Sequence, residues 1–397
     1  MKKISLLIIC ALALSVSLNA QNQTIFLGSS GIPSHGIPMA QIFDNQIKDK
    51  SVYQQQKNKV FYVWGSRSSE QPEYVTGSKY FPSIRNPDRK LDIKWYQENH
   101  PDWIMYQEDR KTPAYGYIYS YGGLVPLDVS NPEVREYYLQ KFIMPAVQAG
   151  YKVIAMDNVD LGNWPKAVGR YSGNEWVKLY TGQKNDTTFH KNMIGWMQFL
   201  KDKLNPLGIA LVGNIKANSA PEPVVLEIIQ AVDAWLDENG FAHRGINVTD
   251  DKWEKAMAII HKITPEKGYI SINQMKGEHA NDWPKEQVEY VIGNYLLSRG
   301  PSSLLAMVGY TDKAIYHHFS YRKEIDTDIG EPVSVPTKLD SGLWIRRYSK
   351  GLVIVNPSSK ETRSFKLPKG IWSTWDNDTV EGKINIPAAS AKVLSSK

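Results

Sequence analysis

The sequence predicts an α/β protein whose main part is a (β/α)8 TIM barrel, followed by a small antiparallel β-sandwich domain. Short apolar runs alternate with helix-like stretches from about residue 22 to residue 310. These runs number eight, and eight βα units in a segment of this length match the size and rhythm of such a barrel. After about Pro336 the pattern changes to short alternating runs separated by turn sequences, which is typical of a sandwich.

The expected barrel strands are the short apolar runs. They are Thr24–Leu27, Val60–Trp64, Trp103–Gln107, Val153–Met156, Ile209–Val212, Ala234–Leu236, Tyr269–Ile272 and Ser303–Val308. The expected helices are the segments between them with apolar residues at helical spacing. They are Met39–Lys57, Lys90–Asn99, Pro132–Gln148, Thr188–Leu204, Pro221–Gln230, Asp251–Lys262 and Lys285–Ser298. In the third of these helices, Ser130 is the expected N-cap and Pro145 is expected to cause a kink.

The expected strands of the sandwich lie within Gly342–Tyr348, Gly351–Val355, Ser364–Leu367, Gly370–Trp375 and Lys392–Leu394. A polar stretch with Gly330, Pro332 and Pro336 separates the two folds. We therefore expect a barrel over residues 21–330 and a sandwich domain over residues 338–397.

Residues 1–20 have the layout of a cleavable secretory signal. Lys2 and Lys3 precede an apolar run from Ile4 to Val16, which is too short to span a bilayer, and Ala20 offers a small residue at the cleavage point. We expect the mature chain to be periplasmic or extracellular, without a membrane anchor. The single cysteine, Cys10, lies inside the signal, so the mature protein has no disulfide and no cysteine metal site.

The amino-acid composition restricts the kinds of molecule that the protein is expected to bind. The formal net charge is +6, and the basic residues do not form a stripe, which argues against a nucleic-acid partner. The chain has 12 Trp and 22 Tyr, and aromatic rings both fill cores and stack on sugar faces. The histidines show no metal-binding spacing, so we expect neither a metal nor a cofactor, and we expect a monomer with a carbohydrate substrate.

Acids and amides at the predicted strand ends are the candidates for chemistry, because a barrel directs those positions into one pocket. The acids are Asp157 and Asp160 after the fourth strand, Asp237 and Glu238 after the sixth, and Glu108 and Asp109 after the third. The fifth and seventh strands end in Asn214 and Lys216, and in Asn273 and Gln274. Two carboxylates with nearby amides suit glycoside hydrolysis, which needs an acid for the departing oxygen and a second carboxylate at the anomeric carbon.

Adjacent residues of a strand face opposite ways, so Asp237 and Glu238 cannot both face the pocket. We select Glu238, which lies nearer the mouth and precedes a sharp turn at Gly240. Aromatic residues complete the expected sugar site. Trp64 ends the second strand, and Tyr119 belongs to a series of tyrosines at alternating positions from 115 to 121. This series forms either a wall that stacks on sugars or a hairpin arm packed on the barrel rim.

Three segments resemble glycoside-hydrolase-like barrels of exported bacterial proteins. These are P-D-W-I-M-Y-Q-E-D at 101–109, L-D-V-S-N-P-E-V-R-E-Y-Y at 127–138 and G-Y-K-V-I-A-M-D-N-V-D at 150–160. The resemblance is to the glycoside hydrolase family 15-like group and, more distantly, to the dextranase and endo-polygalactosaminidase families. It implies that Asp157 is the nucleophile and Glu238 the acid/base of an enzyme that retains configuration at α-linked sugars, and that Asp128 is structural.

The sequence thus predicts an exported glycoside hydrolase that cleaves a poly- or oligosaccharide with Asp157 and Glu238. Predicted substrate contacts are Asp160, Asn214, Lys216, Asn273, Gln274, Trp64, Glu108 and Tyr119. One alternative is a glycan-binding barrel without catalysis, which would keep the aromatic residues but need no carboxylate pair. A metal-assisted hydrolase is a third interpretation, which the histidine spacing disfavours.

Overall fold

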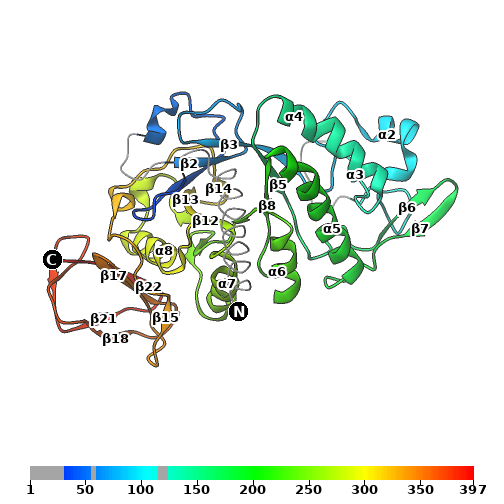
Figure 1. Cartoon of the computed structure of the whole chain (residues 1–397). Helices are drawn as coiled ribbons and strands as arrows, with labels where there is room; N and C mark the ends of the chain where they lie inside the picture. The colour runs from blue at the N-terminus through cyan, green and yellow to red at the C-terminus, as the bar shows by residue number, and fades with distance from the viewer. Residues whose placement is uncertain (1–30, 55–59, 115–123) are drawn as a thin grey trace, which may run out of the picture. The chain divides into compact units, whose positions relative to one another are not determined.

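The computed structural model describes residues 31–54, 60–114 and 124–397. Its main sheet contains a closed eight-stranded parallel barrel, in which each strand bonds to the next and the last pairs with the first. Figure 1 labels most of these strands. The strands in order are β1 (Met39–Ile42), β2 (Val60–Trp64), β3 (Thr76–Pro82), β5 (Val153–Asp157), β8 (Ala210–Asn214), β9 (Ala234–Asp237), β12 (Gly268–Lys276) and β13 (Ser303–Tyr310). The predicted barrel class is therefore confirmed.

Two of the predicted barrel strands differ from those observed. The predicted helix over Met39–Lys57 is wrong, because among its described residues the first form β1 and the only helical part is the 3-10 helix Lys50–Gln54. All four residues of β1 are buried, and so short an apolar run has no periodicity that separates strand from helix. The predicted first strand, Thr24–Leu27, lies outside the described residues.

The third barrel strand is β3, which lies between the predicted strand Val60–Trp64 and the predicted helix Lys90–Asn99, where the sequence predicts no strand. Its residues T-G-S-K-Y-F-P lack a continuous apolar run, which hid the strand. The predicted third strand, Trp103–Gln107, instead forms the end of a 3-10 turn and the short strand β4 (Tyr106–Gln107). β4 belongs to a separate three-stranded sheet with β6 (Val168–Ser172) and β7 (Glu175–Lys178).

The later strands and most helices are confirmed. The observed helices are α2 (Ile93–Asn99), α5 (Thr187–Leu204), α6 (Glu222–Gln230), α7 (Asp250–Ile263) and α8 (Lys285–Ser298). None of the helices in the described part of the chain is both long and apolar enough to cross a membrane.

The predicted third helix is interrupted near Pro145. It runs as α3 (Pro132–Tyr138), a π-helical turn (Leu139–Ile143) and α4 (Met144–Gln148). The wider turn accommodates a proline, which has no N–H to donate and whose ring crowds the preceding turn. The N-cap is Asn131, whose side chain accepts from the Glu133 amide, and not the predicted Ser130.

The described chain divides into two compact units. The first comprises the residues up to Arg67 together with Gln71–Gly77 and Leu236–Lys397, and the second comprises Ser68–Glu70 and Ser78–Trp235. The division passes through β3 and β9, so the end of β5 belongs to the second unit and the turn after β9 to the first.

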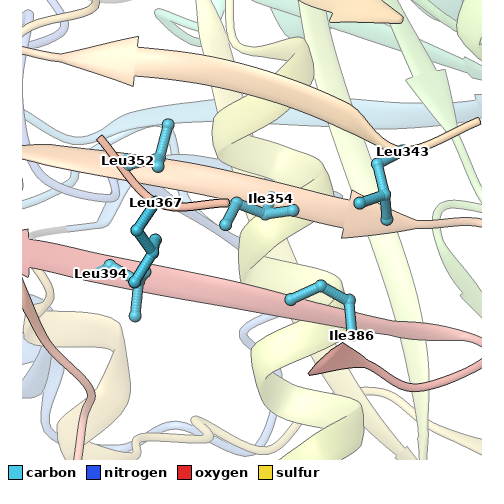
Figure 2. Packing of buried hydrophobic residues seen from close by; sticks show 6 residues of the cluster. All are labelled: Leu343, Leu352, Ile354, Leu367, Ile386 and Leu394. Atoms are coloured by element: carbon cyan, nitrogen blue, oxygen red, sulfur yellow. The ribbon is translucent and has the colours of Figure 1, made fainter. Parts of the chain in front are cut away.

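The C-terminal part of the first unit forms the predicted sandwich of antiparallel sheets. A six-stranded sheet contains β15 (Thr337–Lys338), β16 (Trp344–Tyr348), β17 (Gly351–Asn356), β22 (Ser390–Ser396), β19 (Trp372–Ser373) and β20 (Thr379–Val380). A two-stranded sheet contains β18 (Arg363–Lys366) and β21 (Lys383–Ile386). The apolar side chains between them form one core, of which Figure 2 shows Leu343, Leu352, Ile354, Leu367, Ile386 and Leu394.

Helix α8 joins this sandwich to the barrel strands of the same unit. Every residue from Gln287 to Ser298 is buried, as expected for a helix covered on all faces. A Cβ atom built on Gly293 would lie 2.6 Å from Cβ of Ala391, so the helix and β22 meet at a position that only glycine allows. Glu289 pairs with Lys392 at 2.7 Å across the same contact.

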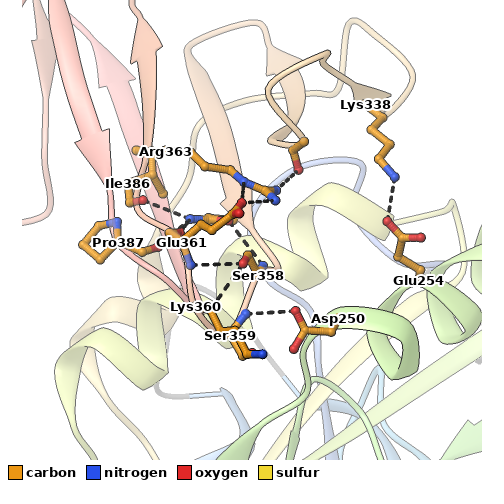
Figure 3. A network of polar contacts seen from close by, with 12 residues as sticks. Asp250, Glu254, Lys338, Ser358, Ser359, Lys360, Glu361, Arg363, Ile386 and Pro387 are labelled. Carbon is orange, nitrogen blue, oxygen red and sulfur yellow. Dashed lines mark hydrogen bonds and ion pairs between the residues drawn. The ribbon is translucent and has the colours of Figure 1, made fainter.

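Arg346 on β16 fixes the end of α8. Its Nη1 donates to the carbonyls of Leu296, Leu297 and Arg299 at 2.7–3.2 Å, and its Nε donates to Ser334. Helix ends leave such carbonyls without partners inside the helix, and a cation there also interacts favourably with the helix dipole. Figure 3 shows further polar contacts to α7, including Asp250 with Ser359 and Glu254 with Lys338.

These contacts predict that Arg346→Met destabilises the protein by about 2–4 kcal/mol, because several buried carbonyls lose a charged donor. The midpoint of thermal unfolding measures the change. The matched control is Arg347→Met on the exposed neighbour, which should leave the midpoint within about 1 °C. Equal midpoints for the two variants would contradict the role of Arg346.

Candidate active site

Asp157 is the last residue of β5, and three hydrogen-bond donors surround its carboxylate. Tyr80 Oη donates to Oδ2 at 2.5 Å, Asn158 Nδ2 donates to the same oxygen at 2.8 Å, and Asn214 Nδ2 donates to Oδ1 at 2.8 Å. The four residues before Asp157 are buried, and Asp157 itself is half-buried. Donors to both oxygens favour the charged carboxylate and fix its orientation, which is what a nucleophile needs.

The two strands beside β5 supply two of these donors, and the third, Asn158, directly follows Asp157. Tyr80 lies on β3, directly opposite Ala155, and Asn214 ends β8. Asn214 was predicted to contact substrate, and the structure places its side-chain amide on Asp157 instead. Tyr80 is absent from the predicted site residues, because the sequence predicts no strand over the residues of β3. A polar residue in a strand flanking a catalytic strand is the signal that could have identified it.

The chain turns sharply after Asp157. Asn158 has φ 57°, a left-handed conformation that asparagine adopts more readily than most residues. Its carbonyl accepts from the Ser83 hydroxyl at 2.8 Å, and the Val159 amide donates to the Asn214 carbonyl at 3.1 Å. Ser83, directly after β3, and Asn214, the last residue of β8, thereby hold the backbone that follows the carboxylate.

Asp160 and Lys216 form a pair in the same unit. Lys216 Nζ lies 3.3 Å from Asp160 Oδ2, while Asp160 Oδ1 accepts from the Gly162 amide at 2.7 Å. The Lys216 side chain is 45 % exposed, whereas that of Asp160 is 11 % exposed. Of these two predicted contacts, Lys216 therefore has more surface to offer a sugar hydroxyl.

Glu238 follows β9 in the first unit, where Tyr316 Oη donates to its Oε1 at 2.5 Å. Gln274, at 5 % exposure, reaches the same hydroxyl with its Nε2 at 3.4 Å. Gln274 Oε1 in turn accepts from the Arg244 amide at 2.9 Å. The predicted contact residue Gln274 thus lies beside the Glu238 carboxylate, joined to it through Tyr316.

Asp237 lies on the other side of β9 and is fully buried. Its Oδ1 accepts from the Asn239 amide at 3.0 Å, and its Oδ2 accepts from Tyr269 Oη at 3.3 Å. Burial raises the pKa of Asp237 to about 6, although hydrogen bonds from the amides of Asn239 and Gly240 oppose this rise. At 1 % exposure this carboxyl cannot reach a substrate, whereas Glu238 is half-buried.

Asn273 does not fit its predicted role as a substrate contact. It is fully buried, its Oδ1 accepts from the amides of Phe241 and Ala242, and its Nδ2 donates to Ser271 and Ala306. It supports the turn after β9, where a Cβ on Gly240 would lie 2.2 Å from the Ile272 carbonyl oxygen. Neighbours on β12 face opposite ways, so Gln274 and Asn273 could not both face the site.

The remaining predicted contacts are aromatic or acidic. Trp64 is the last residue of β2 and is 3 % exposed, so its ring belongs to the core. Glu108 follows β4 outside the barrel sheet, has an exposed side chain and lies 3.6 Å from Lys178. Its expected place at a barrel strand end is therefore wrong, because the third barrel strand is β3 and not Trp103–Gln107. Tyr119 lies outside the described residues.

The described residues contain no group of three or more histidine, cysteine or acidic side chains arranged to hold a metal ion. His317 and His318 follow β14 (Ala314–Ile315), and His317 stacks on Phe43 with ring centroids 5.0 Å apart. Burial lowers the pKa of His317, consistent with a packed neutral ring.

A parallel barrel with acids and amides at the carboxyl ends of its strands is the architecture of many glycoside hydrolases. The family model described as "Hypothetical glycosyl hydrolase family 15" matches residues 60–352, and the chain belongs to this family. Family and fold together point to hydrolysis of glycosidic bonds. No protein of curated function matches the chain.

Glycoside hydrolases are among the solved structures with a similar fold. The GH27 β-L-arabinopyranosidase Abp from Geobacillus stearothermophilus has 9 % identity and a TM-score of 0.53, over 91 % of this chain and 96 % of that one. A family GH13_31 enzyme has 11 % identity and a TM-score of 0.50, over 91 % and 99 %. The maltogenic α-amylase AmyB from Thermotoga neapolitana has 13 % identity and a TM-score of 0.46, over 81 % and 78 %. At these identities the likeness to the two enzymes with TM-scores of 0.50 and 0.53 shows the fold alone.

The buried Asp237 predicts a pH-dependent change in stability. A rise in its pKa from 3.8 to about 6 corresponds to at most about 3 kcal/mol. Because the folded state binds this proton more tightly than the unfolded state, the contribution of Asp237 to stability is fullest below about pH 4. It declines as the pH rises to about 6, and above that a constant penalty remains.

Asp237→Asn should therefore raise the midpoint of thermal unfolding at pH 7 more than at pH 4, while hydrolytic activity persists. Thermal melts of both proteins across this range measure the difference. Parallel curves would contradict the raised pKa, and a loss of activity without a loss of stability would contradict the assignment of catalysis to Glu238.

Proposed function

We propose that this protein is an exported glycosidase that hydrolyses an α-linked poly- or oligosaccharide with retention of configuration. Asp157 is the nucleophile and Glu238 is the acid/base. The observation that carries the proposal is the Asp157 carboxylate at the end of β5, held by donors from Tyr80, Asn158 and Asn214. Export rests on the signal-like residues 1–20.

In the first step, the Glu238 carboxyl gives its proton to the glycosidic oxygen while Asp157 attacks the anomeric carbon. The bond to the departing sugar breaks, and a glycosyl ester forms on Asp157. The hydrogen bonds to Asp157 are strongest before attack, when the carboxylate carries a full charge. They orient one of its oxygens and keep it from accepting the proton meant for the leaving group.

In the second step, Glu238 is ionised and removes a proton from water, which attacks the same anomeric carbon. The ester bond to Asp157 breaks, the carboxylate returns and Glu238 regains its proton. Lys216, paired with Asp160, is positioned on the same unit as Asp157 and offers an exposed donor for a sugar hydroxyl. These two steps use only groups of the protein and one water.

The test is a panel of α- and β-linked glycans incubated with the mature protein, with new reducing ends as the measurement. We expect cleavage of an α-linked substrate. Asp157→Asn and Glu238→Gln should each lower turnover on it by about a thousandfold or more, with unchanged melting curves. Asp202→Asn, which alters an exposed carboxylate on α5, is the control and should leave turnover unchanged.

Near wild-type turnover by Asp157→Asn would exclude this residue as nucleophile. Binding of a glycan without new reducing ends would instead favour the non-catalytic binding barrel.

A further inference from the structure

Tyr316 donates a hydrogen bond to Glu238, and no sequence pattern identifies it as a partner of this residue. It follows β14, the short strand that folds back antiparallel on the end of β13. The next residues bond to the end of β1, since the His317 amide donates to the Ile42 carbonyl at 3.1 Å and Gln41 Nε2 donates to the His318 carbonyl at 3.2 Å. The backbone around Tyr316 is therefore fixed at both ends.

The Tyr316 ring is held against an unusual aromatic pair. Its ring meets Phe43 edge to face at 6.1 Å, and Phe43 stacks on His317 at 5.0 Å. Phe43 and His317 have φ values of 53° and 68°, in the left-handed region that costs bulky residues energy. Such strain persists only where the surroundings enforce it, and it concentrates at functional sites.

Gln274 determines where the Tyr316 proton points. Gln274 Oε1 accepts from the Arg244 amide at 2.9 Å, so its Nε2, which is only a donor, faces Tyr316 Oη at 3.4 Å. Tyr316 Oη must therefore accept from Gln274, and its own proton is directed to Glu238 Oε1 at 2.5 Å. Donation runs in one direction, from Arg244 through Gln274 and Tyr316 to the carboxylate.

We propose that Tyr316 is a positioning residue for the acid/base Glu238, an inference that rests on the proposed function. A glutamate side chain has several rotatable bonds, whereas a general acid must stand within about 2.6–3.2 Å of the oxygen that it protonates. The hydroxyl bond to Oε1 fixes the rotation of the carboxyl group. It also stabilises the negative charge that Glu238 carries between the two steps.

The test varies the leaving group, because this distinguishes a loss of proton donation to the departing oxygen from a general loss of activity. Hydrolysis of the natural glycosidic bond needs a proton on the departing oxygen, whereas a dinitrophenyl group departs without one. Tyr316→Phe should therefore lower kcat/KM about 10- to 100-fold on the oligosaccharide, and less than about threefold on the dinitrophenyl α-glycoside of the sugar released.

Tyr321→Phe is the matched control. It removes the same kind of bond, from Tyr321 Oη to Asp326 Oδ2 at 2.6 Å, in the same segment of the chain. It should change kcat/KM on neither substrate. Glu238→Gln is the reference and should show the same leaving-group dependence as Tyr316→Phe, to a larger extent.

The outcomes distinguish this inference from the proposed function. If Glu238→Gln shows the leaving-group dependence and Tyr316→Phe does not, the positioning role is wrong and the glycosidase remains. Equal losses by Tyr316→Phe on both substrates would also overturn it. If no glycan is cleaved, the proposed function fails. Crystal structures of the wild type and Tyr316→Phe then test whether Tyr316 fixes the orientation of the Glu238 carboxyl group. An unchanged Glu238 side chain in the variant would overturn the positioning role.

Discussion

The position of Asp157 depends on the register of three adjacent parallel strands. Tyr80 on β3 lies opposite Ala155, and Met156 lies opposite Gly213, the residue before Asn214 on β8. Since side chains alternate along a strand, a slip of one residue on either side would turn a donor away from the carboxylate. The apolar residues Val153–Met156, all buried, make such a slip costly, so the packing of β5 also fixes the position of the carboxylate at its end.

The same alternation of side chains decides which of two neighbouring polar residues is buried at the ends of β9 and β12. At the end of β9, Asp237 is buried, and the next residue, Glu238, accepts a hydrogen bond from Tyr316. On β12 the alternation buries Asn273 beneath the turn at Gly240 and leaves Gln274 beside Tyr316. In each of these neighbouring pairs, one member supports the turn after β9 and the other bonds to Tyr316. Both candidate carboxylates are thus hydrogen-bonded by a tyrosine, Tyr80 or Tyr316.

The sequence predicted the barrel class, the sandwich and six of the eight strands, because continuous apolar runs such as Val153–Met156 are a strong local signal. It missed β1, which is too short to show a period, and β3, whose residues are largely polar. Missing β3 meant missing Tyr80. Tyr316 could not be predicted for a different reason. It contacts Glu238 only because the chain folds back after β13, and no local sequence pattern predicts such a contact.

The most direct test of the account is the configuration of the first sugar released. A nucleophilic Asp157 requires two displacements at the anomeric carbon, so an α-linked substrate must give an α product before mutarotation. Proton NMR of the reaction in its first minutes reads the anomeric proton directly. The account predicts the α anomer, and a β anomer formed first would contradict it by showing that water attacks the sugar in a single step.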